Sequence, residues 1–367
     1  MKLNTAKKLT AGALALSMMF AMAVPMAFAE SGTEVAPSTT PHITKKYTAT
    51  NADTSSPAET FTFTAVATDV KNAGVKEDGK TPITKADAPE LTIESAKYGL
   101  NGATSDGATQ NLTITKDKAF PNVGIYYYTV TEAPSGNAGV KTHAGDMLLK
   151  VSVVYNEAGT ALEEKYVFYN GMNPTTGEGT TGTKGAAIEN TYSAGSLEVK
   201  KVVTGNLGDK NKKFNVTVTF TAPAGKTVAG DISYVENGTP KTIKSSDWKD
   251  GVATVKIAVA HNDDAITFTN IPYDVTYSVK EDDYTKAADG TTKDYDEAKY
   301  EAVDSDTEKG TKGKIDTASE TMTITNNKGN DNIDTGVILD NAPYILMLAV
   351  VAGGAMTLVI KKRREEE

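Results

Sequence analysis

The fold is decided by residues 197–203, which read LEVKKVV. Side chains of an extended strand alternate between the two faces of a sheet, so positions 197, 199, 201 and 203 share one face. Leu and Val occupy three of these positions, which places Lys201 on the face that packs into a core. A buried lysine is costly unless it is paired or neutral. The stretch therefore predicts a half-buried β-strand that brings a lysine into the protein interior.

A second stretch of this kind lies near the start of the chain. Residues 43–47 read ITKKY, and alternation places Lys45 on the same face as Ile43 and Tyr47. Burial disfavours the charged form of a lysine, and the neutral amine is a nucleophile. Lys45 and Lys201 are therefore candidate reactive groups. The alternative is that both lie on solvated strand edges.

Short alternating runs bounded by Gly, Pro, Asn or Asp fill the chain on both sides of these stretches. The first series covers residues 43–48, 59–67, 91–97, 111–115, 125–132, 147–154 and 165–169. The second series covers residues 197–204, 214–221, 252–259, 265–270, 276–281, 300–303 and 320–326. About seven short strands in each series predict an all-β protein of two tandem Ig-like β-sandwiches.

The boundary between the two series is predicted at residues 191–196. This segment reads TYSAGS, and its small and polar residues suit a short linker. We expect a first domain over residues 30–193 and a second over residues 194–328.

Two glutamates are expected to share the interior with the lysines. Residues 126–132 read YYYTVTE and residues 275–281 read VTYSVKE, so alternation puts Glu132 and Glu281 on the faces that carry apolar side chains. A carboxyl group on an apolar face tends to keep its proton. We expect it to donate a hydrogen bond to a carboxamide oxygen and to shuttle protons.

Two asparagines could supply that carboxamide. Residues 187–190 and 323–326 read as the closing strands of the two series, and they end at Asn190 and Asn326. The alternative is that these asparagines form turns.

Composition argues against several other kinds of site. The chain carries a net charge of -9, which leaves no basic surface for nucleic acid. It has 3 His and no Cys, so disulfides are excluded and a zinc site is poorly supplied. The acidic segment over residues 282–313, with Asp304 and Asp306, lacks the spacing of an EF-hand loop, so we expect a solvated loop there. No cofactor or metal is predicted.

The N-terminus is typical of an exported protein. Three lysines within the first eight residues precede an apolar stretch over residues 9–24, and residues 27–29, AFA, form a cleavage site of the A-x-A type. We predict a signal peptide over residues 1–29, cut between Ala29 and Glu30. The alternative of a first transmembrane helix is disfavoured, because the apolar stretch is short.

The C-terminus carries a second address. A polar linker over residues 329–343 contains the sequence NIDTG at 332–336. The apolar residues 344–360 are about long enough to span a bilayer, and the tail, residues 361–367, opens with four cations that favour the cytoplasmic side. The alternative is a plain membrane anchor that is never cut.

These residues and motifs resemble the self-crosslinking domains of Gram-positive backbone pilins. In that family a lysine of the first strand attacks an asparagine of the last strand, ammonia leaves, and a buried glutamate assists. The resemblance implies two intramolecular isopeptide bonds, for which the sets are Lys45, Glu132, Asn190 and Lys201, Glu281, Asn326. The neighbouring Lys46, Lys200 and Asn327 are rivals that alternation directs towards solvent.

The C-terminal address resembles the sorting signal of Gram-positive surface proteins. In such signals a sortase cleaves between Thr and Gly, which implies that Thr335 becomes the acyl donor and Gly336 is discarded. Asp334 departs from the pattern, because pilin signals have Pro there. In a backbone pilin the sortase joins this threonine to a lysine of the next subunit. Lys184, expected in a flexible loop, is the candidate, and the alternative is that Lys184 is merely solvated.

We therefore predict a structural backbone subunit of a covalently polymerised, cell-wall-anchored pilus. Its expected partners are a sortase, other pilin subunits, peptidoglycan and a host surface ligand. Its only chemistry would act once, on itself, so it is not an enzyme in the ordinary sense. The alternative is a cell-wall adhesin that is anchored singly and not polymerised. A glycan-acting enzyme is a weak third hypothesis, because no pair of carboxylates can be placed across a cleft.

Overall fold

The computed structural model describes residues 41–51, 54–145, 147–171, 183–262, 265–303 and 311–329. The predicted signal peptide, its cleavage site at Ala29 and Glu30, the sorting motif with Thr335 and Gly336, and the apolar residues 344–360 lie outside these ranges. Within them, none of the helices has the length and apolar character that crossing a membrane requires.

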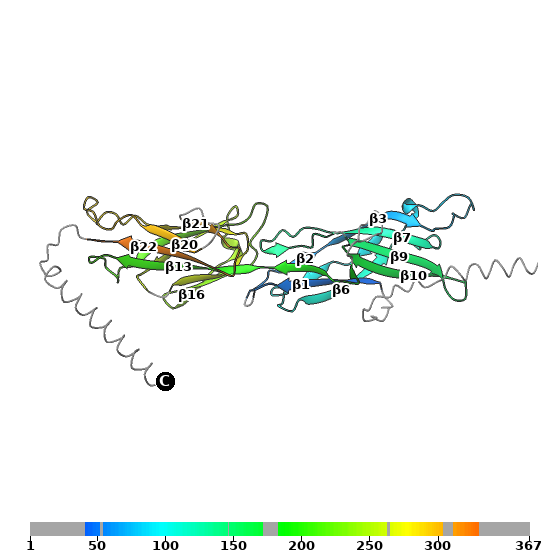
Figure 1. Cartoon of the computed structure of the whole chain (residues 1–367), viewed down its shortest axis with the longest axis horizontal. Coiled ribbons are helices and arrows are strands. Elements are labelled where there is room, and N and C mark those ends of the chain that lie inside the picture. Colours follow the sequence, from blue (N-terminus) through cyan, green and yellow to red (C-terminus); the bar gives the residue numbers. More distant parts are fainter. Residues whose placement is uncertain are drawn as a thin grey trace, which may run out of the picture. The chain divides into compact units, whose positions relative to one another are not determined.

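The described residues form an all-β structure, as the alternating runs predict (Figure 1). The strands before residue 193 are β1 (His42–Ala49), β2 (Glu59–Phe61), β3 (Phe63–Lys71), β4 (Leu91–Ile93), β5 (Ala96–Tyr98), β6 (Ala108–Lys116), β7 (Gly124–Glu132), β8 (Val140–Lys141), β9 (Met147–Tyr155), β10 (Leu162–Asn170), β11 (Thr183–Lys184) and β12 (Ile188–Tyr192). The strands that follow are β13 (Ala194–Thr204), β14 (Phe214–Thr221), β15 (Ile232–Glu236), β16 (Thr239–Ile243), β17 (Val252–Val259), β18 (Ile266–Pro272), β19 (Thr276–Glu281), β20 (Lys299–Val303), β21 (Lys312–Lys314) and β22 (Ser319–Asn327). Two single 3₁₀ turns complete the structure, η1 (Lys85–Asp87) and η2 (Ser245–Asp247).

The first part of the chain folds around one large sheet. Its strand order is β11-β10-β9-β7-β3-β4-β6-β1-β12-β8, and β2 pairs with β5 beside it. Strands β3 and β4 join through a single pair, Ala65 with Leu91, so the sheet can fold back on itself at this point. The fold brings β1 and β7, which are far apart in the strand order, to opposite sides of one hydrophobic core.

The second part is a sandwich of two separate sheets. Six strands are ordered β16-β15-β18-β13-β22-β20, and four are ordered β17-β14-β19-β21. Its core contains Leu197 and Val199 from β13, Val216 and Val218 from β14, and Val279 from β19. These are the inward positions of alternating strands, so burial follows the period of two.

Every predicted run contains a strand, but two of the runs divide. Residues 59–67 become β2 and β3, and residues 91–97 become β4 and β5, because the chain changes its pairing partner within each run. The hairpin of β15 and β16 was not predicted. Its turn is Asn237-Gly238 with φ of 50° and 74°, which is the left-handed geometry that makes Asn-Gly a hairpin signal.

The acidic segment is not simply a solvated loop, so that expectation was wrong in part. Tyr295 is 1% exposed and packs with Val203 and Phe214 in a small core, and Tyr284 packs against the ring of Phe214. The segment also contains β20 and the start of β21. The segment is rich in carboxylates, which favour solvent, but its tyrosines have large apolar rings that favour burial. Residues 304–310, with Asp304 and Asp306, lie outside the described ranges.

Candidate crosslink sites

The first and last strands of each part lie side by side and run parallel. Strand β1 pairs with β12 so that Tyr47 faces Asn190, and β13 pairs with β22 so that Val203 faces Asn326. The asparagine is thus opposite the residue two positions after the lysine in both pairs. Residues two apart on one strand point to the same side of the sheet, and so do residues opposite each other on paired strands. Each lysine and its asparagine therefore point to the same side.

The first site is formed by Lys45, Glu132 and Asn190. Lys45 and Asn190 have no exposed surface, and Glu132 at the end of β7 is 8% exposed. Lys45 Nζ lies 3.0 Å from Glu132 Oε1, and Asn190 Nδ2 donates a hydrogen bond of 2.6 Å to the same oxygen. One carboxylate oxygen therefore contacts both the amine and the carboxamide nitrogen.

Burial shifts Lys45 towards its neutral form. Desolvation by burial lowers the pKa of Lys45 from its usual value to about 8, against the opposing effect of Glu132. The ring centroids of Phe61 and Phe63 lie 4.8 and 5.8 Å from Nζ. A pKa near 8 makes part of the amine neutral at physiological pH, and only the neutral amine is nucleophilic.

The carboxamide oxygen at this site also has a donor. The backbone N–H of His143 donates a hydrogen bond of 2.8 Å to Asn190 Oδ1. A backbone N–H can only donate, so this contact turns Oδ1 away from Glu132 and Nδ2 towards it. We expected Glu132 to donate to the carboxamide oxygen, but the structure shows the carboxylate accepting from the nitrogen instead.

The second site is formed by Lys201, Glu281 and Asn326, which are 4%, 5% and 1% exposed. Lys201 Nζ lies 2.7 Å from Glu281 Oε1, whereas Asn326 Nδ2 donates to the other carboxylate oxygen, Oε2, at 2.6 Å. Desolvation by burial lowers the pKa of Lys201. The ring of Phe214 lies beneath Nζ at 4.2 Å.

The rival residues lie outside these clusters. Lys46 pairs with Glu189 at 3.1 Å and Lys200 pairs with Glu198 at 2.6 Å, in both cases at partly exposed positions. Asn327 donates to Asp296 at 2.7 Å. The alternation that pointed Lys45 and Lys201 inward thus directs their neighbours outward.

Lys184 is exposed, but it does not lie in a loop as expected. It belongs to β11 and pairs with Tyr169 of β10. Its backbone is therefore held at the edge of the sheet while its side chain is open to solvent. The residues before it, 172–182, lie outside the described ranges.

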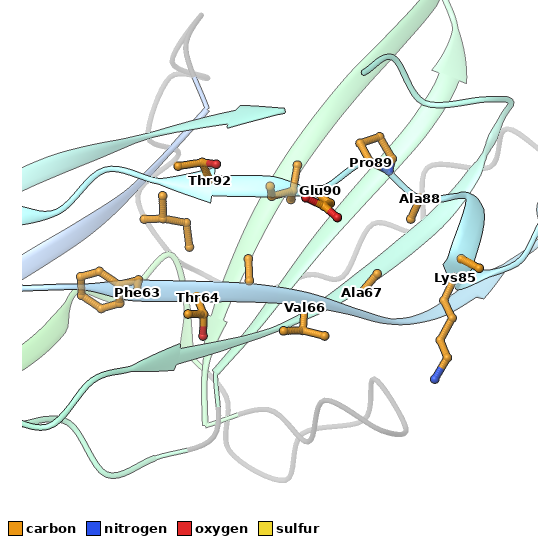
Figure 2. A pocket seen from close by; sticks show the side chains of 13 residues that line it. Phe63, Thr64, Val66, Ala67, Lys85, Ala88, Pro89, Glu90 and Thr92 are labelled. Carbon is orange, nitrogen blue, oxygen red and sulfur yellow. The ribbon is translucent and has the colours of Figure 1, made fainter. Parts of the chain in front are cut away.

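A separate pocket lies between β3 and the segment that leads into β4 (Figure 2). Lys85 and Glu90 are its charged residues, and Phe63, Val66 and Pro89 provide much of its apolar lining. The pocket contains none of the Lys, Glu and Asn residues of the two clusters, but Phe63 lines it and also lies near Lys45. Among the described residues, no group of three or more His, Asp or Glu side chains is placed to hold a metal ion.

His143 and the aromatic residues around the lysines were not predicted from the sequence. The N–H of His143 acts through the backbone, so no pattern of side chains could reveal it. Phe61 and Phe214 stand at inward positions of predicted strands, but their contact with a lysine depends on how the strands pack.

Comparison with known proteins agrees with the motifs. Residues 195–328 match a family described as a domain of unknown function, DUF7601. A protein named Pilin from Streptococcus pyogenes serotype M1 is 28% identical over 337 residues, which cover 87% of this chain and 90% of that protein. The predicted resemblance to pilins is therefore confirmed along nearly the whole length.

Solved structures of major pilins from Streptococcus pyogenes are also similar. One is 20% identical with a TM-score of 0.49 and covers 79% of this chain and 99% of its own. Another is 23% identical with a TM-score of 0.47 and covers 79% of this chain and 98% of its own.

Proposed function

We propose that the chain is a structural backbone subunit of a covalently assembled pilus, in which each of two domains ties its first strand to its last by an isopeptide bond. The observation that carries the proposal is the repeated cluster of one buried Lys, one buried Glu and one buried Asn on parallel terminal strands. Its occurrence in a relative of a pilin supports the structural function. The proposed domains are residues 30–193 and 194–328.

The reaction at the first site needs no group beyond those present. The neutral amine of Lys45 attacks Cγ of Asn190, a bond forms between Nζ and Cγ, and the bond from Cγ to Nδ2 breaks. Glu132 Oε1 contacts both nitrogens, so it takes a proton from Nζ and returns one to Nδ2, which leaves as ammonia. Lys201, Glu281 and Asn326 would react in the same way.

Such bonds suit a fibre without cysteines. In the chain-entropy model, closing a loop of more than 100 residues stabilises a domain by about 5 kcal/mol. The mechanical effect matters more for a fibre. The bond joins the first strand of the domain to the last, which lies beside it, so a covalent link holds the two together under tension. An amide also resists reductants that would cleave a disulfide.

Export and assembly depend on residues outside the described ranges. We propose that the signal peptide directs the chain out of the cell, and that residues 344–360 hold it in the membrane. A sortase would then join Thr335 to Lys184 of another subunit, and at the base of the fibre to peptidoglycan. This would make the protein a cell-surface component anchored to the wall, with a host ligand as a further candidate partner.

Intact mass of the exported part, residues 30–335, tests the crosslinks. Each bond releases ammonia and lowers the mass by about 17 Da. We expect a deficit of two such units, with one lost in Glu132→Ala and the other in Glu281→Ala. A wild-type chain that has folded without any deficit would refute the crosslinks.

Gel analysis of cell-wall fractions tests polymerisation. A backbone subunit gives a ladder in denaturing gels, and Lys184→Ala should reduce the ladder to the monomer. Lys165→Ala is the matched control, because Lys165 is exposed on the strand next to β11. A single band in the wild type would favour the singly anchored adhesin.

A further inference from the structure

The loop after β8 brings a backbone donor to the first site. Strand β8 runs antiparallel to β12, with Lys141 opposite Thr191 and Val140 opposite Tyr192. The chain that leaves β8 therefore passes directly beside Asn190. There the N–H of His143 lies 2.8 Å from Asn190 Oδ1 and 3.3 Å from Glu132 Oε2.

Asn190 Oδ1 is the atom on which negative charge develops during the reaction. When Lys45 attacks Cγ, the carbonyl bond opens and negative charge moves onto Oδ1. A donor 2.7–3.1 Å from the developing oxyanion stabilises the transition state more than the ground state, and more strongly where water is excluded. The N–H of His143 already lies 2.8 Å from the carboxamide oxygen before the reaction, so it is in place to follow Oδ1 as charge develops, and Asn190 is fully buried.

We propose that the backbone N–H of His143 is the oxyanion donor of the first crosslink, an inference that rests on the proposed self-crosslinking. It has two effects. It stabilises the tetrahedral intermediate at Oδ1, and it fixes the carboxamide with Nδ2 towards Glu132, where the leaving nitrogen receives its proton. The proposed donor is the backbone N–H at position 143 and not the imidazole ring.

The second site lacks this contact within the part of the chain that the structure describes. Asn326 Oδ1 is buried there without a hydrogen-bond partner. Strand β22 lies between β13 and β20, and β20 pairs with it from Lys299 opposite Thr325 to Val303 opposite Thr321. No described N–H of this neighbouring segment reaches the carboxamide oxygen, so the second crosslink provides an internal reference.

An ester substitution can remove this donor alone. In the His143→Ala chain, cell-free translation with lactic acid at position 143 replaces the N–H by an oxygen and keeps the side-chain methyl. The matched form carries alanine at the same position. Synthesis is stopped in denaturant at successive times, and peptide mass spectrometry measures each crosslink separately.

We expect the ester form to close the first crosslink about 10²- to 10³-fold more slowly than the amide form, the effect of deleting one oxyanion donor. The second crosslink should close at equal rates in both, which shows that synthesis and the folding of the second domain are unchanged. A further control places the ester one residue earlier, at Thr142, where the His143 N–H is retained and the rate should stay near that of the amide form.

Equal rates for the first crosslink in the two forms would overturn the inference while leaving the crosslinks intact. An ester at Thr142 that slows the reaction as much would overturn it too, because the loop and not the donor would then be responsible. A failure of the proposed function looks different, since neither crosslink would then form in the wild-type chain.

Discussion

The two candidate crosslink sites use the same three residue types on the same framework and differ in what surrounds them. In both, the lysine lies two positions before the residue that is opposite the asparagine of the parallel strand. A glutamate at the end of another strand contacts the lysine. At the first site one glutamate oxygen serves both nitrogens, and a backbone N–H binds the carboxamide oxygen. At the second site the two glutamate oxygens are divided between lysine and asparagine.

The difference shows which parts of the site depend on the strands and which on the connections. The parallel pairing of the first and last strands gives the lysine and the asparagine the same relative position at both sites. The surrounding groups come from elements that differ between the two parts. At the first site these are Phe61, Phe63 and the loop after β8, and at the second site the ring of Phe214. The two sites should therefore differ in rate more than in outcome.

Removing either asparagine should give the largest effect. Asn190→Ala or Asn326→Ala leaves the Lys–Glu ion pair in place but abolishes one crosslink, so each should lose a deficit of about 17 Da and about 5 kcal/mol of unfolding free energy in its own domain. Intact mass and urea unfolding measure the two quantities. Asn327→Ala is the control. It removes the hydrogen bond to Asp296, so it should cost only about 1 kcal/mol and keep both deficits. An Asn326→Ala chain that keeps both deficits would point to Asn327 instead.

The rate of the first crosslink should depend steeply on pH. Because burial lowers the pKa of Lys45 to about 8, most of the amine is charged, and therefore unreactive, below that pH. As pH rises the neutral fraction grows, so the rate should increase about tenfold per pH unit up to about 8 and then level off. Refolding of chain recovered unfolded from inclusion bodies, at pH 6 to 9, measures this. A rate that is flat over the range would show that deprotonation of Lys45 is not limiting.

The comparison of the sites predicts their order of closure. With an oxyanion donor at the first site and none described at the second, the Lys45–Asn190 bond should form roughly tenfold or more faster than the Lys201–Asn326 bond in the same chain. Peptide mass spectrometry during refolding reports both rates together. If the Lys201–Asn326 bond forms first, the predicted order is wrong, and the surroundings of Lys201 affect the rate more than the donor at the first site does.

The smallest effect is expected from the neighbouring lysines. Lys46→Ala and Lys200→Ala remove partly exposed ion pairs, which contribute about 0–1 kcal/mol, and they touch neither cluster. Both variants should retain the full mass deficit and unfold close to the wild type. A deficit lost in either one would mean that the register of that first strand differs from the one described.

The sequence by itself determined the strands and the direction of the lysines. In LEVKKVV and ITKKY the apolar neighbours fix which face is buried, and because the side-chain period of a strand is two, Lys45 and Lys201 cannot turn outward without exposing those neighbours. The same alternation placed Glu132 and Glu281, and the order of the strands suggested Asn190 and Asn326 as the closing residues.

Only the tertiary structure decided what these residues meet. The parallel register of first and last strands, the aromatic rings beside each amine and the N–H of His143 at Asn190 all join segments that are far apart in the chain. The burial of Tyr295 over Phe214 in a segment that looked solvated has the same origin. Local periodicity reports the face on which a side chain lies, whereas pairing across a fold depends on long-range packing that no single stretch encodes.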